Sequence, residues 1–275
     1  MCDICVMNAV KTKMLSRRNF FKSAAGGALA AAAGTGLAGP AQAAGMSMGM
    51  KPADMTHTYD ENFPTYFGAP GISKDQKFNF ADNGFNLFEL TINEHTGTHI
   101  DAPLHFSADG NSVDEIPVES LVAPLCVIDI KARAAENPDA QVTPDDIKAW
   151  IAANGDIPAG ACVAMNSGWD KHVNSDKFRG ADADGKMHFP GFHIEATRML
   201  MEETGAASMA VDTLSLDFGL SADFATHYAW LPSGRFGIEN IANLDAVPAA
   251  GATLVIGAPK HRGGSGGPAR IIALM

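Results

Sequence analysis

Three histidines and one aspartate stand within eleven residues of this chain, in the stretch HTGTHIDAPLH from His95 to His105. The preceding segment, Phe85–Ile92, alternates its apolar side chains and predicts a strand with both faces partly covered. Gly97 and Pro103 disfavour a helix, so a tight loop at the end of that strand is expected. Imidazole nitrogen and carboxylate oxygen together suit zinc, manganese or iron(II). The stretch therefore predicts a metal site, and the alternative is a polar loop that is rich in histidine by chance.

Composition and charge limit the partners. The chain has 275 residues, of which 46% are hydrophobic and 19% charged, which is enough apolar material for one sizeable core. Residues 1–43 carry a net charge of +4, so the total of −11 leaves −15 on the remainder. Such a charge repels phosphate groups and excludes nucleic acid and anionic membrane as expected partners. A small-molecule substrate is expected instead.

The first 43 residues have the order of a secretory signal. A basic segment, SRRNFFK at Ser16–Lys22, precedes a mild apolar run of alanine and glycine and then AQA at Ala41–Ala43. Paired arginines before two phenylalanines resemble a twin-arginine signal. We expect the twin-arginine export machinery as a partner, cleavage after Ala43 and a periplasmic destination. The alternative, an amphipathic helix in the mature protein, is disfavoured by the many glycines.

The four cysteines fall into two pairs. Cys2 and Cys5 form a CxxC without a second pair of ligands, and they would leave with the signal. Cys126 and Cys162 stand in short apolar runs that are typical of buried strands. We interpret both as structural thiols. A disulfide between them is the alternative in an oxidising compartment.

The rest of the chain is predicted to be one domain. Residues 44–56 show no periodicity and are expected to form a flexible lead-in, followed by a domain over 57–275. Apolar runs bounded by turn residues recur along it, and two helices are expected between them. One covers 143–154, where Thr143 is a good N-cap, and the other covers 194–203. A mixed α/β fold with more strand than helix follows.

The signature HTGTHIDAPLH resembles the HxGTHxDxPxH motif of the cyclase family, which includes bacterial kynurenine formamidases and isatin hydrolases. Further segments, among them MNSGWD and the carboxyl-terminal block from HYAWLPSG onward, are similar to family segments in the same order. The resemblance covers about residues 57–274. It implies a swivelling β/β/α fold, an enzyme, and a homodimer or homotetramer.

The resemblance also implies roles for single residues. The first two histidines and the aspartate of the motif hold a metal in the family, and its last histidine transfers protons. A later histidine and a glutamate twelve residues beyond it complete a two-metal site in the formamidases. The corresponding metal ligands are His95, His99, Asp101, His227 and Glu239, with His105 as the catalytic residue and Phe63 as a substrate-binding aromatic residue. Relatives of the isatin hydrolase type carry an amide in place of the glutamate and hold one metal, so Glu239 favours two ions.

These roles predict a reaction. We expect hydrolysis of a carbon–nitrogen bond in an aryl formamide, lactam or cyclic amide by metal-activated water, with His105 as general base and acid. The cofactor is one or two divalent ions, with Zn²⁺ expected and Mn²⁺ as an alternative. A lactone hydrolase remains open, as does a periplasmic binding protein for a metal or small molecule. The presence of His105 favours an enzyme, because a binding protein needs no base beside its metal.

Two further features are interpreted as structural. The segment GGSGGPAR, Gly263–Arg270, lacks the lysine and helix start of a phosphate-binding loop and is expected to be a flexible turn. Five histidines lack partners at ligand spacing and are expected to be structural or exposed: His57, His172, His188, His193 and His261.

Overall fold

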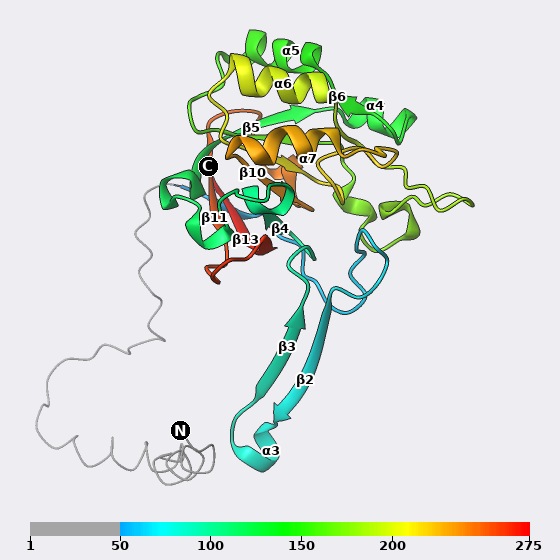
Figure 1. Ribbon diagram of the computed structural model, residues 1–275, viewed down its shortest axis with the longest axis vertical. Coiled ribbons are helices and arrows are strands. Elements are labelled where there is room, and N and C mark those ends of the chain that lie inside the picture. Colours follow the sequence, from blue (N-terminus) through cyan, green and yellow to red (C-terminus); the bar gives the residue numbers. More distant parts are fainter. Residues whose placement is uncertain (1–49) are drawn as a thin grey trace, which may run out of the picture. The chain divides into compact units, whose positions relative to one another are not determined.

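The computed structural model describes residues 50–275 (Figure 1). The predicted signal peptide, its cleavage after Ala43, the Cys2 and Cys5 pair and the first part of the lead-in lie outside the described residues. Within residues 50–275, no helix is long and apolar enough to span a membrane.

One sheet organises the described part of the chain. Among residues 50–275, nine strands form it in the order β1-β13-β11-β5-β7-β9-β10-β4-β12. The four strands β5, β7, β9 and β10 run parallel, and the pairs outside them are antiparallel. In that order the strands are β1 (Pro52–Asp54), β13 (Arg270–Leu274), β11 (Ala252–Gly257), β5 (Val122–Asp129), β7 (Cys162–Asn166), β9 (Ser208–Val211), β10 (Phe236–Glu239), β4 (His99–Asp101) and β12 (Gly266–Pro268).

Smaller elements complete the fold. The hairpin of β2 (Ile72–Phe78) and β3 (Leu87–Ile92) forms a separate two-stranded sheet, as do β6 (Gln141–Val142) and β8 (Gly191–Phe192). The helices are α3 (Phe80–Asn83), α4 (Lys131–Glu136), α5 (Pro144–Asn154), α6 (Ile194–Glu203) and α7 (Ala225–Trp230). The described part of the chain also has seven short 3-10 turns: Pro103–Phe106, Val113–Glu115, Val118–Leu121, Asp170–His172, Asp176–Phe178, Leu231–Ser233 and Leu244–Ala246. The strand-rich α/β class predicted from the sequence is confirmed.

The two predicted helices are present as α5 and α6. At the start of α5 the Asp146 carboxylate accepts hydrogen bonds from the backbone N–H and the hydroxyl of Thr143, at 2.7 and 2.8 Å. This reciprocal cap and the proline at the first helical position explain why the helix begins there. Gly155 ends α5 with a φ of +91°. The short helices α4 and α7 were not predicted, since six residues carry too little periodicity.

Both faces of the sheet are buried. Cys126 and Val163 pack on one face with Ile147 and Leu200 of α5 and α6, the two helices labelled above the sheet in Figure 1. The opposite face contributes Leu125, Ala164, Leu254 and Ile100 to a second core. Parallel strands covered on both sides have near-continuous apolar sequences, as these do.

The two described cysteines are free and buried, which confirms their interpretation as structural thiols. In the register of β5 and β7, Leu125 pairs with Cys162 and Cys126 pairs with Val163. Neighbouring residues of a strand point to opposite faces, so the two thiols lie on opposite sides of the sheet. The alternative of a disulfide between them is wrong.

Two expectations about the first part of the domain need correction. The lead-in ends earlier than predicted, because residues 52–54 form β1 and pair with β13, and Met55 is fully buried. Backbone pairing at a sheet edge needs no side-chain periodicity, which explains why this strand was not predicted. The predicted strand at Phe85–Ile92 is β3, but every residue of it is exposed rather than partly covered.

Candidate metal centre

The histidine-rich stretch folds differently from the expected loop. Residues His99–Asp101 form β4, which pairs with β10 on one side and β12 on the other. Since side chains alternate along a strand, His99 and Asp101 share one face and Ile100 enters the core behind them. Gly97 has a φ of +64°, and a methyl group there would lie 2.9 Å from the Tyr59 ring. The turn before β4 therefore requires glycine.

The ligands expected from distant parts of the sequence come to the same place. Glu239 is the last residue of β10 and stands directly opposite His99 in the antiparallel register. His227 lies on α7, and its side chain reaches the two carboxylates from that helix. All four side chains are nearly inaccessible to solvent, with exposed fractions between 0 and 6% for His99, Asp101, His227 and Glu239.

Each carboxylate has one oxygen near each of two histidines. Asp101 Oδ1 lies 3.3 Å from His99 Nε2, and Asp101 Oδ2 lies 3.7 Å from His227 Nε2. Glu239 Oε2 lies 3.3 Å from His99 Nε2, and Glu239 Oε1 lies 3.2 Å from His227 Nε2. The two carboxylates thus span the space between the two imidazoles, an arrangement suited to bridging cations.

The outer ring nitrogens fix how the histidines point. His99 Nδ1 lies 2.9 Å from the Gly97 carbonyl oxygen, so Nδ1–H donates there and Nε2 faces the carboxylates. His227 Nδ1 lies 2.6 Å from Asp217 Oδ2 and is oriented in the same way. His99 Nε2 and Asp101 Oδ2 are buried without a hydrogen-bond partner among the described residues. Buried polar atoms of this kind need a partner, and a divalent cation fits them.

The electrostatics favour a cation at this position. Burial alone would lower the pKa of His99, but the Asp101 and Glu239 carboxylates outweigh it and raise the pKa to about 10. The pKa of His227 is also raised, because Asp101, Asp217 and Glu239 outweigh its burial. Without a metal the carboxylates therefore hold protons on both imidazoles. A metal must displace these protons, so metal affinity falls as pH falls.

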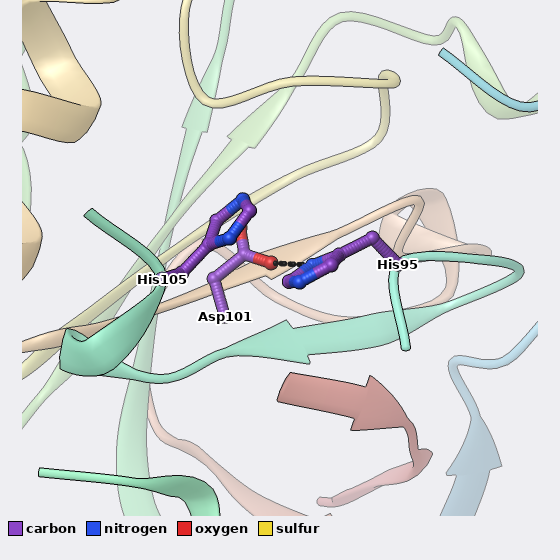
Figure 2. A group of neighbouring side chains, drawn as sticks. All are labelled: His95, Asp101 and His105. Carbon is purple, nitrogen blue, oxygen red and sulfur yellow. Dashed lines mark hydrogen bonds and ion pairs between the residues drawn. The ribbon is translucent and has the colours of Figure 1, made fainter. Parts of the chain in front are cut away.

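His95 and His105 lie beside Asp101 (Figure 2). His95 Nδ1 is 2.7 Å from Asp101 Oδ1, the contact drawn as a dashed line. The His105 ring stacks on the His95 ring with a centroid distance of 3.8 Å. Ligand atoms of His95, Asp101 and His105 lie within 4.8 Å of one another. Burial lowers the pKa of His105 to about 4, so its imidazole is neutral at pH 7 and can accept a proton.

A cavity of about 380 Å³ opens over the cluster. His95, His99, His105, His227 and Glu239 contribute its polar wall. The rest of the wall is mainly apolar and aromatic, including Pro64, Tyr66, Phe67, Pro70, Phe106, Leu214 and Phe224. A flat aromatic molecule fits such a wall, with its polar end toward the histidines.

Phe63 is not part of that wall. Its side chain is 7% exposed and packs against His57 and Phe178, with ring centroids 5.9 and 6.3 Å away. The prediction that Phe63 binds substrate is not supported by this position, because the chain turns after Pro64 and presents Tyr66 and Phe67 to the cavity instead. Asp217, which orients His227, was missed because its contact with α7 arises only from the tertiary fold.

Comparisons with known proteins show the family of this chain. The family model described as "Putative cyclase" matches residues 53–218. The isatin hydrolase of Roseibium aggregatum is 36% identical over 195 residues, which cover 68% of this chain and 73% of that protein. The kynurenine formamidase of Salinibacter ruber is 27% identical over 197 residues, covering 70% of this chain and 82% of that protein.

Solved structures give the same relationship. Isatin hydrolase A from Labrenzia aggregata, bound to benzyl benzoate, aligns with a TM-score of 0.78 and 36% identity over 84% of this chain and 96% of that chain. Isatin hydrolase A from Ralstonia solanacearum aligns with a TM-score of 0.78 and 34% identity over 88% and 100%. Because the family model matches more than half of this chain and the isatin hydrolase of Roseibium aggregatum is 36% identical over 68% of it, this chain belongs to the cyclase family.

Proposed function

We propose that this protein is a metal-dependent hydrolase that cleaves the carbon–nitrogen bond of an aromatic amide, with a cyclic amide of the isatin type as the preferred class. The observation that carries the proposal is the buried set of histidines and carboxylates with unpartnered ligand atoms, at the base of an aromatic cavity. The similarity to isatin hydrolases and kynurenine formamidases supports the reaction class. An aryl formamide is the second substrate class.

The reaction follows from the residues around the cavity. A divalent ion supplies a Lewis acid that lowers the pKa of water and polarises a carbonyl group. His105 is neutral at pH 7 and lies beside the ligands, so it takes a proton from the attacking water. The new carbon–oxygen bond forms as the carbon–nitrogen bond breaks, and His105 returns the proton to the departing nitrogen. The aromatic wall, with Phe106 and Phe224, holds the substrate ring and excludes water.

A substrate screen tests this proposal. The metal-loaded protein is assayed with isatin, formanilide and a benzo-fused lactone, and the open-chain products are measured by absorbance and mass. Turnover of isatin or formanilide above the lactone is expected, because protonation by His105 helps an amine leave more than an alkoxide. Preference for the lactone would favour an ester-cleaving relative, and tight binding of all three without turnover would favour a binding protein.

We propose that the site holds two ions, Zn²⁺ in the first place and Mn²⁺ as the alternative. The nitrogen and oxygen ligands suit either metal. Asp101 and Glu239 each have one oxygen toward His99 and the other toward His227, which supports a bridged pair.

Replacing Glu239 with glutamine tests the number of ions. The amide oxygen can still accept the hydrogen bond that the Leu216 N–H donates to Glu239 Oε1, so the fold is expected to remain. One carboxylate charge is lost between the histidines, and we expect the metal content to fall from two ions to one per chain. Inductively coupled plasma mass spectrometry after gel filtration measures this ratio. Equal metal content in the variant and the parent would contradict a bridging role for Glu239.

We also propose that the protein is exported through the twin-arginine route to the periplasm. The order of residues 1–43, with paired arginines before a mild apolar run, supports this. A protein that must load its metal before export suits a route that carries folded proteins. The intact mass of the exported protein is expected to match a chain that begins at Ala44. A mass that includes residues 1–43 would contradict the proposal.

We propose a homodimer or homotetramer. The exposed apolar side chains of β3 support association, since Phe88 and Leu90 are 45% and 49% exposed. Light scattering coupled to gel filtration measures the assembled mass, and a monomeric mass would contradict this proposal.

A further inference from the structure

Outside the metal centre, Ser265 contacts the far ring nitrogen of His95 and is joined through Glu94 to His261. Ser265 Oγ lies 3.0 Å from His95 Nε2 and donates a hydrogen bond of 2.5 Å to Glu94 Oε2. The Ser265 backbone N–H donates to the same oxygen at 3.1 Å. His261 Nε2 lies 2.6 Å from Glu94 Oε1. Both oxygens of Glu94 are therefore engaged, and Ser265 connects this carboxylate with His95.

The hydrogen-bond directions determine which tautomer His95 adopts. A hydroxyl group has one proton, and Ser265 donates it to Glu94. Ser265 can then only accept at His95 Nε2, so this nitrogen carries the proton in the neutral imidazole. The Nδ1 lone pair consequently faces Asp101 Oδ1 at 2.7 Å. Two electron-rich atoms so close together repel each other unless a cation or a proton lies between them.

The glycine-rich segment makes this contact possible. Ser265 directly precedes β12, which pairs with β4 so that Gly266 stands opposite Asp101 and Pro268 opposite His99. A methyl group at Gly266 would lie 2.3 Å from the Ile100 carbonyl oxygen and 2.9 Å from His95 Cε1. The expectation of a flexible turn at Gly263–Arg270 is wrong for Gly266–Pro268, which form β12, and Gly266 is required by its close packing against Ile100 and His95.

We propose that Glu94, Ser265 and His261 form an outer clamp that fixes His95 as the Nε2–H tautomer and presents its Nδ1 lone pair to the metal. The inference rests on the proposed metal-dependent function and assigns Glu94 and Ser265 as positioning residues for it. A metal-binding histidine generally donates a hydrogen bond from the N–H of its second ring nitrogen to such a partner. Loss of the partner lowers the affinity for the metal about 10- to 100-fold. In this clamp the partner is Ser265, whose hydroxyl proton is donated to the Glu94 carboxylate.

Removal of the carboxylate should reverse the tautomer. In Glu94→Ala the Ser265 hydroxyl is free to donate to His95 Nε2, which places the proton on Nδ1 and blocks the metal. In Ser265→Ala the acceptor at Nε2 is lost. In Glu94→Gln the amide oxygen can still accept from Ser265, so this conservative variant should restore most of the affinity. A contact that merely fastened the carboxyl-terminal segment would alter thermal stability in all variants without this order in metal affinity.

The test is a chelator competition that measures the dissociation constants of Mn²⁺ and Zn²⁺ for the full chain and its variants. We expect Glu94→Ala and Ser265→Ala to bind about 10- to 100-fold more weakly than the parent, with Glu94→Gln close to the parent. The matched control is Asp146→Ala, which removes a carboxylate that accepts from a hydroxyl at the start of α5, far along the chain from His95. It should lower the melting temperature and leave metal affinity unchanged.

The outcomes separate this inference from the proposed function. If the parent binds neither metal, both the proposed function and the proposed clamp are contradicted. If the parent binds metal and both alanine variants bind it equally tightly, the clamp alone is overturned. Should Glu94→Ala fail to fold, the Ser265→Ala affinity decides, because it removes only a hydroxyl group.

Discussion

Replacing Asp101 with asparagine is expected to abolish both metal binding and turnover. Asp101 is fully buried, and its oxygens lie near three histidines, namely His95, His99 and His227. Asparagine keeps the size but removes the charge that offsets a divalent cation. Loss of the Lewis acid should cost several kcal/mol of transition-state stabilisation, or more than about 10³-fold in kcat/KM.

The matched control for this variant is Asp212→Asn. Asp212 is equally buried, at 1% exposed, but it accepts hydrogen bonds from Ser167 and Trp169 rather than facing histidines. Its replacement should retain the metal. Metal content and kcat/KM of both variants give the comparison. If Asp101→Asn kept the parental metal content, Asp101 would not be a ligand and the site would need reassignment.

Replacing His105 with alanine is expected to separate metal binding from catalysis. His105 stacks on His95 and lines the cavity, and it is not among the proposed metal ligands. Removal of a general base and acid typically lowers the rate about 10²- to 10⁴-fold. We therefore expect kcat to fall by this factor while metal content remains parental.

His172→Ala is the control for this substitution, because His172 packs edge to face against Trp169 and does not line the cavity. Steady-state kinetics and metal analysis measure both variants. A His105→Ala enzyme with parental kcat would show that another group transfers the proton. Loss of the metal in this variant would instead assign His105 as a ligand.

Much of the fold could be predicted from the sequence because the patterns that indicate helices and strands are local. Thr143, Pro144 and Gly155 mark both ends of α5, and continuous apolar runs indicate strands buried on both faces. The edge strand β1 escaped prediction because it is held by backbone pairing with β13. The exposed hairpin strand β3 looked half-buried because its apolar side chains alternate regardless of what covers them.

The site was predictable only in part from the residues themselves. His95, His99 and Asp101 are close in sequence, and their residue types alone indicate a metal. His227 and Glu239 came from family resemblance, because β4 and β10 become neighbours only in the folded sheet. Asp217, Glu94 and Ser265 show no signal at all, since each acts through a contact made by the tertiary fold.

We expect a metal bound by these residues to drive amide hydrolysis. The most direct measurement removes the metal with a chelator, assays isatin hydrolysis, and then restores Zn²⁺ or Mn²⁺ in known amounts. We predict that turnover disappears with the metal and returns in proportion to the ions bound, and that Asp101→Asn recovers nothing. Full isatin turnover by protein shown to be metal-free would contradict a metal-dependent reaction.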